Sequence, residues 1–156
     1  MNIRIVAVGR IKSGPEQDLI NDYVNRFRKT GRGIGLGSLE ILEIDERKAA
    51  TKGAASGQIL PILGAESHVW ACDEHGEDMT SPKFADALRF SIDTGVSSIA
   101  FVIGGADGLD KNVLDRAHKS ISFGKMVWPH KLVRVMLTEQ LYRAVTILSG
   151  RPYHRE

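Results

Sequence analysis

The last six residues, RPYHRE, bring together side chains that can handle a proton and an anion. Histidine titrates near neutral pH, so His154 can accept or release a proton. Arg151 and Arg155 carry planar cations that fork onto oxyanions, and Tyr153 offers a ring on which a nucleic-acid base can stack. Because terminal residues are often frayed, a loose end is the alternative. The tail is a candidate reagent, although no spacing rule joins its residues into a known catalytic set.

A second candidate site lies in the segment FGKMVWPHKLVR, at 123–134. A short apolar strand is expected to run into Pro129, where the last helix begins with unpaired backbone amides. These amides, with His130, Lys131 and Arg134 nearby, favour binding of a carboxylate or a phosphate. The alternative, which the residues alone favour, is that His130 merely caps the helix.

The segment IGGADG, at 103–108, follows a strand that is apolar at successive positions. Such a strand is buried on both faces in the centre of a parallel sheet, and ligands bind beyond the carboxyl ends of parallel strands. Glycine lets a ligand approach the backbone, whose amides and carbonyls can read an adenine edge or a sugar. The segment matches neither GxGxxG nor the phosphate-loop motif. A binding loop and a tight turn therefore stay open as alternatives.

Glycines at 31, 33, 35 and 37 do not predict a dinucleotide site, because a strand rather than a helix follows them. We expect a loop there, and the alternative is that Arg28, Lys29 and Arg32 contact a phosphate backbone.

Potential metal ligands occur at His68, Cys72, Asp73 and His75. Residues 68 and 72 share one face of an expected strand, but 72 and 73 point to opposite faces and no CxxC or HxxxH pair accompanies them. We therefore predict no metal site. Cys72 is interpreted as a packing residue, because no base is assigned to activate its thiol.

The elements that must position these residues alternate between strands and helices, the order of an α/β domain with a largely parallel sheet. Ser13 and Glu16 have capping-box spacing, and Ser81 and Asp110 are predicted N-caps. One domain is expected over 1–156. The predicted strands are 2–8, 39–45, 67–72, 97–103 and 123–128, and the predicted helices are 14–29, 48–63, 81–94, 110–117 and 129–150.

The last predicted helix is apolar over more than one stripe, so it must be covered on more than one side. A second copy of the chain can supply that cover, which predicts a symmetric dimer. The alternative is that the helix packs across one sheet.

Composition and charge suggest an anionic partner in a reducing compartment. Apolar residues make up 42% and charged residues 26% of the 156 residues, with one cysteine. No apolar run approaches a membrane span, so we expect a soluble protein of the cytoplasm. The local charge is +3 over residues 1–52, −7 over 53–110 and +6 over 111–156. A basic last third favours nucleic acid, and a solvated basic helix is the alternative.

Three segments, MNIRIVAVGR, FVIGGADGL and WPHKLVRVMLTEQLYRAVTILSGRPYHRE, together resemble one family along its whole length. This is the RlmH family of the SPOUT superfamily, large-subunit ribosomal RNA methyltransferases that act on N3 of a pseudouridine in 23S rRNA. The resemblance implies an α/β fold with a deep C-terminal trefoil knot, a homodimer, S-adenosylmethionine as cofactor and the assembled ribosome as partner. No periodicity indicates the knot, and the rule against threaded loops argues against it.

The resemblance also implies roles for individual residues. His154 or its neighbours would handle the N3 proton, and the tail arginines would stabilise charge on the adjacent carbonyl oxygens. The family often has an aliphatic residue at Cys72 and Pro-Glu at 106–107, which backbone-mediated binding tolerates. No metal and no membrane are implied. The implied catalytic residues are Tyr153, His154 and Arg155; the cofactor contacts are Cys72, Gly104, Gly105, Phe123, Gly124, Lys125, Met126, Val127 and Trp128; the substrate contacts are His130, Arg134 and Arg151.

Overall fold

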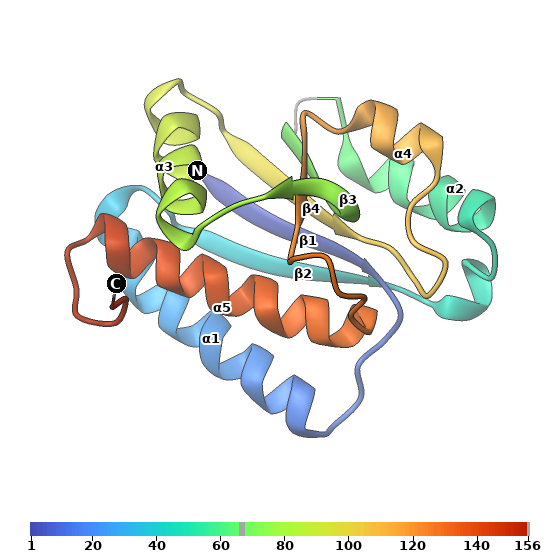
Figure 1. Cartoon of the computed structure of the whole chain (residues 1–156), viewed down its shortest axis with the longest axis horizontal. Coiled ribbons are helices and arrows are strands. Elements are labelled where there is room, and N and C mark those ends of the chain that lie inside the picture. The colour runs from blue at the N-terminus through green and yellow to red at the C-terminus, as the bar shows by residue number, and fades with distance from the viewer. Residues whose placement is uncertain (66–67, 156) are drawn as a thin grey trace.

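Strands and helices alternate along the chain in the computed structural model, which describes residues 1–65 and 68–155 (Figure 1). Two single 3-10 turns, η1 (Arg32–Ile34) and η2 (Glu46–Lys48), flank the second strand. The strands are β1 (Asn2–Val8), β2 (Ser38–Ile44), β3 (His68–Asp78), β4 (Ser98–Ile103) and β5 (Lys119–Ser122). The helices are α1 (Pro15–Gly31), α2 (Lys52–Leu63), α3 (Ser81–Asp93), α4 (Lys111–Arg116) and α5 (His130–Leu148).

The described strands form one parallel sheet in the order β2-β1-β4-β3-β5. β1 and β4 lie inside the sheet, with Ile5 opposite Phe101 and Val6 opposite Val102. Both strands are buried on both faces, which explains why their sequences are apolar at successive positions. The predicted α/β class with a parallel sheet is thereby confirmed.

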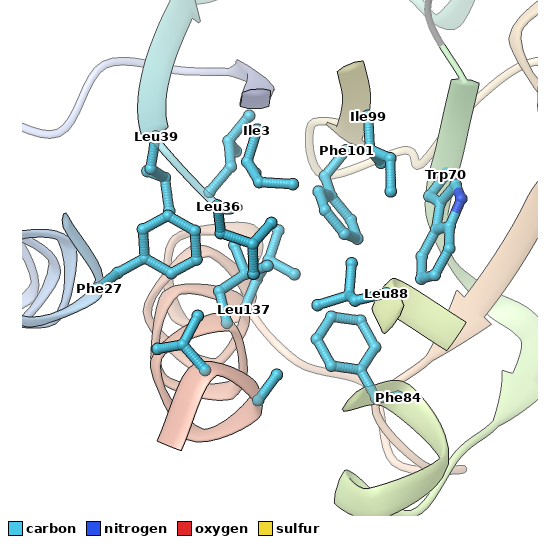
Figure 2. Packing of buried hydrophobic residues seen from close by; sticks show 14 of the residues in the cluster. Ile3, Phe27, Leu36, Leu39, Trp70, Phe84, Leu88, Ile99, Phe101 and Leu137 are labelled. Atoms are coloured by element: carbon cyan, nitrogen blue, oxygen red, sulfur yellow. The ribbon is translucent and has the colours of Figure 1, made fainter. Parts of the chain in front are cut away.

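Helices cover both faces of the sheet, with α1, α5 and α3 on one side and α2 and α4 on the other (Figure 1). The larger cluster includes Trp70, Phe84 and Phe101, whose ring centroids lie 5.3 to 6.0 Å apart. Figure 2 shows these rings beside a second group in which Phe27 and Leu137 reach across from α1 and α5. Alternate residues of β1 divide between the two clusters, so the sheet is the middle layer of three.

The last strand lies earlier in the chain than predicted. β5 is Lys119–Ser122, paired with β3, and residues 123–128 form a loop. Met126 and Val127 in that loop are 74% and 81% exposed, so their apolar character does not reflect burial in a strand. β3 also extends to Asp78 beyond the predicted 67–72, with a register shift between Cys72 and Glu77; position 67 lies outside the described residues.

Helix starts differ from prediction where a different side chain makes the cap. The N-cap of α1 is Gly14, with no side-chain bond, so the capping box from Ser13 was wrong. Thr51 caps α2, accepting from the Ala54 amide at 3.1 Å, and therefore delays the start predicted at 48. Thr80 rather than Ser81 caps α3, since Ser81 donates to Gln140 Oε1 instead (2.7 Å). Asp110 caps α4 as predicted.

Helix α5 is covered by the sheet and flanked by α1 and α3 (Figure 1). From Val133 to Ser149 every residue is at least half-buried. Packing across one sheet between two helices thus accounts for the broad apolar surface of this helix, without deciding whether a second copy adds cover. Among the described residues, no helix is long and apolar enough to span a membrane.

Candidate active site

A cavity of about 790 Å³ opens at the carboxyl edge of the sheet. Three segments form its wall: residues 72–75 after the first pairing of β3, residues 103–109 after β4, and most of 121–130 before and into α5. Its volume falls within the range of small-molecule sites. The structure thus brings the IGGADG loop and the segment before the last helix to one cavity, as the position of parallel strand ends predicts.

The IGGADG loop is a tight turn and also forms a wall of the cavity. The tight turn and the binding loop that the sequence left open as alternatives are therefore compatible. The Gly108 amide donates to the Gly105 carbonyl at 3.0 Å, and the two residues form an isolated bridge. A Cβ on Gly104 would lie 2.5 Å from the Gly108 oxygen. A side chain at position 104 would therefore force this turn open, and the glycines leave the backbone accessible at this wall of the cavity.

The loop at 123–128 forms the outer wall. Its path is held by two short contacts: Ser122 Oγ donates to the Gly124 carbonyl at 2.9 Å, and Trp128 Nε1 donates to the Phe123 carbonyl at 3.2 Å. Gly124 adopts φ +102°, a conformation that favours glycine. Of the predicted cofactor contacts in this loop, all but Lys125 line the cavity.

Cys72 lines the cavity from the end of the first β3 segment. Burial, and secondarily the charge of Asp73, raises the pKa of the Cys72 thiol to about 12. The thiol is therefore neutral at physiological pH, which agrees with a packing role and excludes an activated nucleophile. Among the described residues, no group of three or more His, Cys, Asp and Glu side chains converges in a way that could hold a metal ion.

His130 and Arg134, one turn apart on α5, have different surroundings. His130 lines the cavity, and its Nε2 lies 3.3 Å from Glu46 Oε1. The Arg134 side chain is 1% exposed; it donates to Glu43 Oε2 at 2.6 Å and to the Gly9 carbonyl at 2.8 Å. Burial lowers the pKa of Arg134, and the hydrogen bond that Arg134 donates to Glu43 opposes that shift. Arg134 thus ties α5 to the ends of β1 and β2 and does not reach the cavity.

The C-terminal tail folds back along α5, beyond the end of that helix in Figure 1. Tyr153 Oη donates to Glu139 Oε1 at 3.0 Å, and an Arg143 nitrogen lies 3.3 Å from His154 Nδ1. Arg143 also pairs with Glu139 at 2.5 Å and lies 4.8 Å above the Tyr153 ring. Burial, followed by the bond to Glu139, raises the pKa of Tyr153, so its phenol stays protonated.

The tail and the cavity are separate within one chain. None of residues 151–155 lines the 790 Å³ cavity. The anchor of Tyr153, Glu139, stands nine residues along α5 from His130, which is about 14 Å at the rise of an α-helix. A second cavity of about 610 Å³ lies beside Glu139 and Arg143 and shares the Ile121–Gly124 wall with the first. The predicted catalytic residues thus gather at one place and the predicted cofactor contacts at another.

Comparison with known proteins decides the family. Residues 1–154 match the family model described as a predicted SPOUT methyltransferase. The chain belongs to this family. The resemblance seen in three motifs is confirmed, and the protein is a methyltransferase.

Relatives match the SPOUT methyltransferase over its whole length. Proteins of Dinoroseobacter shibae and Ruegeria pomeroyi are each 51% identical over 155 residues, covering 99% of both chains, and are named ribosomal RNA large subunit methyltransferase H. A solved probable methylase family protein from Haemophilus influenzae has a TM-score of 0.56 at 15% identity, covering 99% of this chain and 70% of that one. A probable methyltransferase from Bordetella pertussis has a TM-score of 0.51 at 15% identity, covering 92% and 93%. At this identity the two structures support the fold alone.

Sequence reasoning about this SPOUT methyltransferase missed the acidic residues around the site. Glu139 and Arg143 hold the tail, and their i, i+4 spacing on the last predicted helix was the available signal. Glu43 and Glu46 meet Arg134 and His130 from the end of β2. No spacing signal indicates those pairs, because 84 or more positions separate the partners.

Proposed function

We propose that this methyltransferase transfers a methyl group from S-adenosylmethionine to N3 of a pseudouridine in the 23S rRNA of the assembled ribosome. The cavity at the carboxyl edge of the sheet is the observation that carries the proposal, because its size suits a nucleoside-sized donor. The full-length relatives named ribosomal RNA large subunit methyltransferase H support the RNA substrate. The deep C-terminal trefoil knot that the family resemblance implies is part of the same proposal.

The cavity residues fit a donor recognised through the backbone. The turn at Gly104 and Gly105 presents peptide groups without a Cβ in the way, and residues 123–128 supply an apolar outer wall. S-adenosylmethionine supplies a methyl group bound to a sulfonium. The methyl group is transferred without the electrons of the carbon–sulfur bond, which stay on sulfur, and this transfer needs no metal. The protein's task is therefore to align the two reactants and to prepare a nucleophilic N3.

The tail acts on the substrate side in this proposal. Loss of the N3 proton spreads negative charge onto the neighbouring carbonyl oxygens of the ring. Arg151 and Arg155, both exposed, are suited to stabilise that charge. His154 and Arg155 are the residues whose loss is expected to stop transfer without loss of donor binding.

The separation of the tail and the cavity supports a homodimer. Since none of the described tail residues 151–155 lines the cavity of its own chain, we infer that a second copy presents its tail there. The 610 Å³ cavity beside Glu139 is the surface on which that copy is expected to lie. A weak net charge of +2 favours recognition of a presented RNA loop over nonspecific phosphate contacts, which agrees with an assembled ribosomal particle in the cytoplasm.

The direct test incubates the protein with tritiated S-adenosylmethionine and ribosomes from a strain that lacks the modification. Tritium at a pseudouridine N3 of 23S rRNA is the expected result, with free rRNA as the comparison substrate. Ribosome binding without transfer would instead identify a binding factor and overturn the proposal.

The composite site is tested by mixing two inactive variants. Gly104→Val blocks the cavity, and His154→Ala with Arg155→Ala removes the tail groups. Each homodimer is expected to be inactive, whereas mixed dimers regain part of the activity because one of their two sites is intact. Mixtures that exchange subunits but stay inactive would refute a site built from two copies.

A further inference from the structure

An acidic residue outside every predicted site lies against the histidine of the cavity wall. Glu46 Oε1 is 3.3 Å from His130 Nε2. Glu46 opens η2, directly after β2, and that turn is held by Asp45, whose carboxylate accepts from the Arg47 amide at 3.0 Å. The contact therefore joins the end of one strand to the first residue of α5, across the edge of the sheet.

Glycine at position 9 makes room for this contact. Gly9 has φ +95°, and a Cβ there would lie 2.6 Å from Glu46 Oε1 and 3.1 Å from His130 Nε2. Both backbone polar groups of Gly9 are hydrogen-bonded. Its amide donates to the Ile44 carbonyl at 2.7 Å, and its carbonyl accepts from Arg134 at 2.8 Å. The end of β1 is thus held in the one arrangement that lets the carboxylate and the imidazole meet.

The contact favours one tautomer of His130. His130 Nε2 is buried and has no hydrogen-bond partner among the described residues, and the Glu46 carboxylate lies 3.3 Å from it. A carboxylate only accepts, so a hydrogen on Nε2 is the arrangement that this neighbour favours, which leaves the lone pair on Nδ1. The surroundings of His154 are the opposite. Its Nδ1 faces Arg143, and a guanidinium only donates, so that lone pair is already occupied.

We propose that His130 and Glu46 form the dyad that removes the N3 proton of the substrate. The proton passes from N3 to His130 Nδ1, the electron pair of the broken N–H bond stays on N3, and that nitrogen then accepts the methyl group. Glu46 is a positioning residue: it holds the tautomer and stabilises the imidazolium that forms, as an acidic residue does behind other histidine bases. This inference rests on the proposed function and replaces His154 by His130 as the base.

Other charged groups near His130 belong to separate arrangements. Lys52, Asp73, Glu74 and His75 line the same cavity from α2 and β3. On α5, Lys131 follows His130 directly, and Arg134 one turn on is already paired with Glu43. Glu46 is the acidic residue whose carboxylate lies at contact distance from the imidazole, so the rate of transfer is expected to respond to Glu46 first.

The test compares single-turnover transfer to ribosomes across pH 5 to 9 for four proteins. The unaltered chain is expected to gain rate as an imidazole loses its proton. His130→Gln should lower the rate about 100-fold or more, which is the usual contribution of a general base. Its rate should also no longer rise with pH as an imidazole loses its proton. Glu46→Gln should lose roughly tenfold in rate, because the imidazolium loses its counter-charge. Glu46→Asp should restore part of the rate.

A second readout does not depend on activity. The ring nitrogen signals of His130 in NMR spectra should report a hydrogen on Nε2 in the unaltered chain and lose that preference in Glu46→Gln. Glu46 has a 57% exposed side chain, so the variant is expected to fold normally. Asp93→Asn, which neutralises an exposed carboxylate at the end of α3, is the matched control and should change neither the rate nor the His130 signals.

The outcomes separate the dyad from the proposed function. If the unaltered chain methylates ribosomes but Glu46→Gln keeps its rate and its His130 ring signals, the dyad is refuted while the methyltransferase stands. If His154→Ala abolishes the rise of the rate with pH and His130→Gln keeps it, the base is in the tail. If the unaltered chain transfers no methyl group, the proposed function itself has failed, and the NMR shift alone then reports on the contact.

Discussion

Replacing Gly104 by alanine tests whether the backbone turn after β4 forms the donor site. The new Cβ would lie 2.5 Å from the Gly108 oxygen and 2.6 Å from its carbonyl carbon, against the 3.4 Å or more of an ordinary contact. The turn must therefore open by about an ångström, which strains the bond from the Gly108 amide to the Gly105 carbonyl. Overpacking of this kind costs about 1–3 kcal/mol.

The strain in Gly104→Ala should appear mainly as lost affinity for S-adenosylmethionine. The loop is at the surface of the sheet and can shift without unfolding the core, so most of the cost is expected to fall on the bound state. Since about 1.4 kcal/mol corresponds to a factor of ten, calorimetry should find a dissociation constant raised roughly 5- to 150-fold. Urea unfolding of the same sample separates this loss from a loss of stability.

Gly57→Ala is the matched control for that measurement. Gly57 lies on α2, and a Cβ there meets nothing within 4 Å. Alanine in a helix is about 0.5–1 kcal/mol more favourable than glycine, so this variant should be slightly more stable and bind the donor normally. Unchanged donor affinity in Gly104→Ala would refute the reasoning that this turn must stay closed for binding.

Two further predictions concern buried groups. Arg134→Met should lower the free energy of unfolding by about 3 kcal/mol, the lower end for a broken buried pair, because the Glu43 side chain is 31% exposed and can be rehydrated; an unchanged urea midpoint would show that the pair does not secure α5. Cys72 should react with iodoacetamide at pH 8 at least about tenfold more slowly in the native protein than in the unfolded chain, since its pKa is raised from 9.0 to about 12. Because the folded pKa lies above the unfolded one, the thiol should favour the folded state below about pH 9 and lose that contribution as pH rises toward 12. Equal rates of alkylation would contradict the raised pKa of the Cys72 thiol.

Local patterns predicted the elements and their order well, because they depend on neighbouring residues. The successive apolar residues of 97–103 indicated an interior strand, and β4 is buried within the sheet. Asp110 was recognised as a cap from its position before a helical pattern. The strand predicted at 123–128 was wrong because Met126 and Val127 are apolar without being buried. An exposed apolar loop and a short buried strand have the same local pattern.

Periodicity and contiguous motifs are local properties, and they were enough to establish the α/β class and the family, while at IGGADG they left a tight turn and a binding loop open. Which side chains meet depended on the tertiary packing. It placed Arg134 in a buried ion pair with Glu43, Tyr153 on Glu139 and Glu46 against His130. Such contacts depend on how strand ends and helices pack in three dimensions, and partners 84 to 91 positions apart carry no spacing signal. Packing therefore determined the surroundings of each candidate base, which the residue types alone left open.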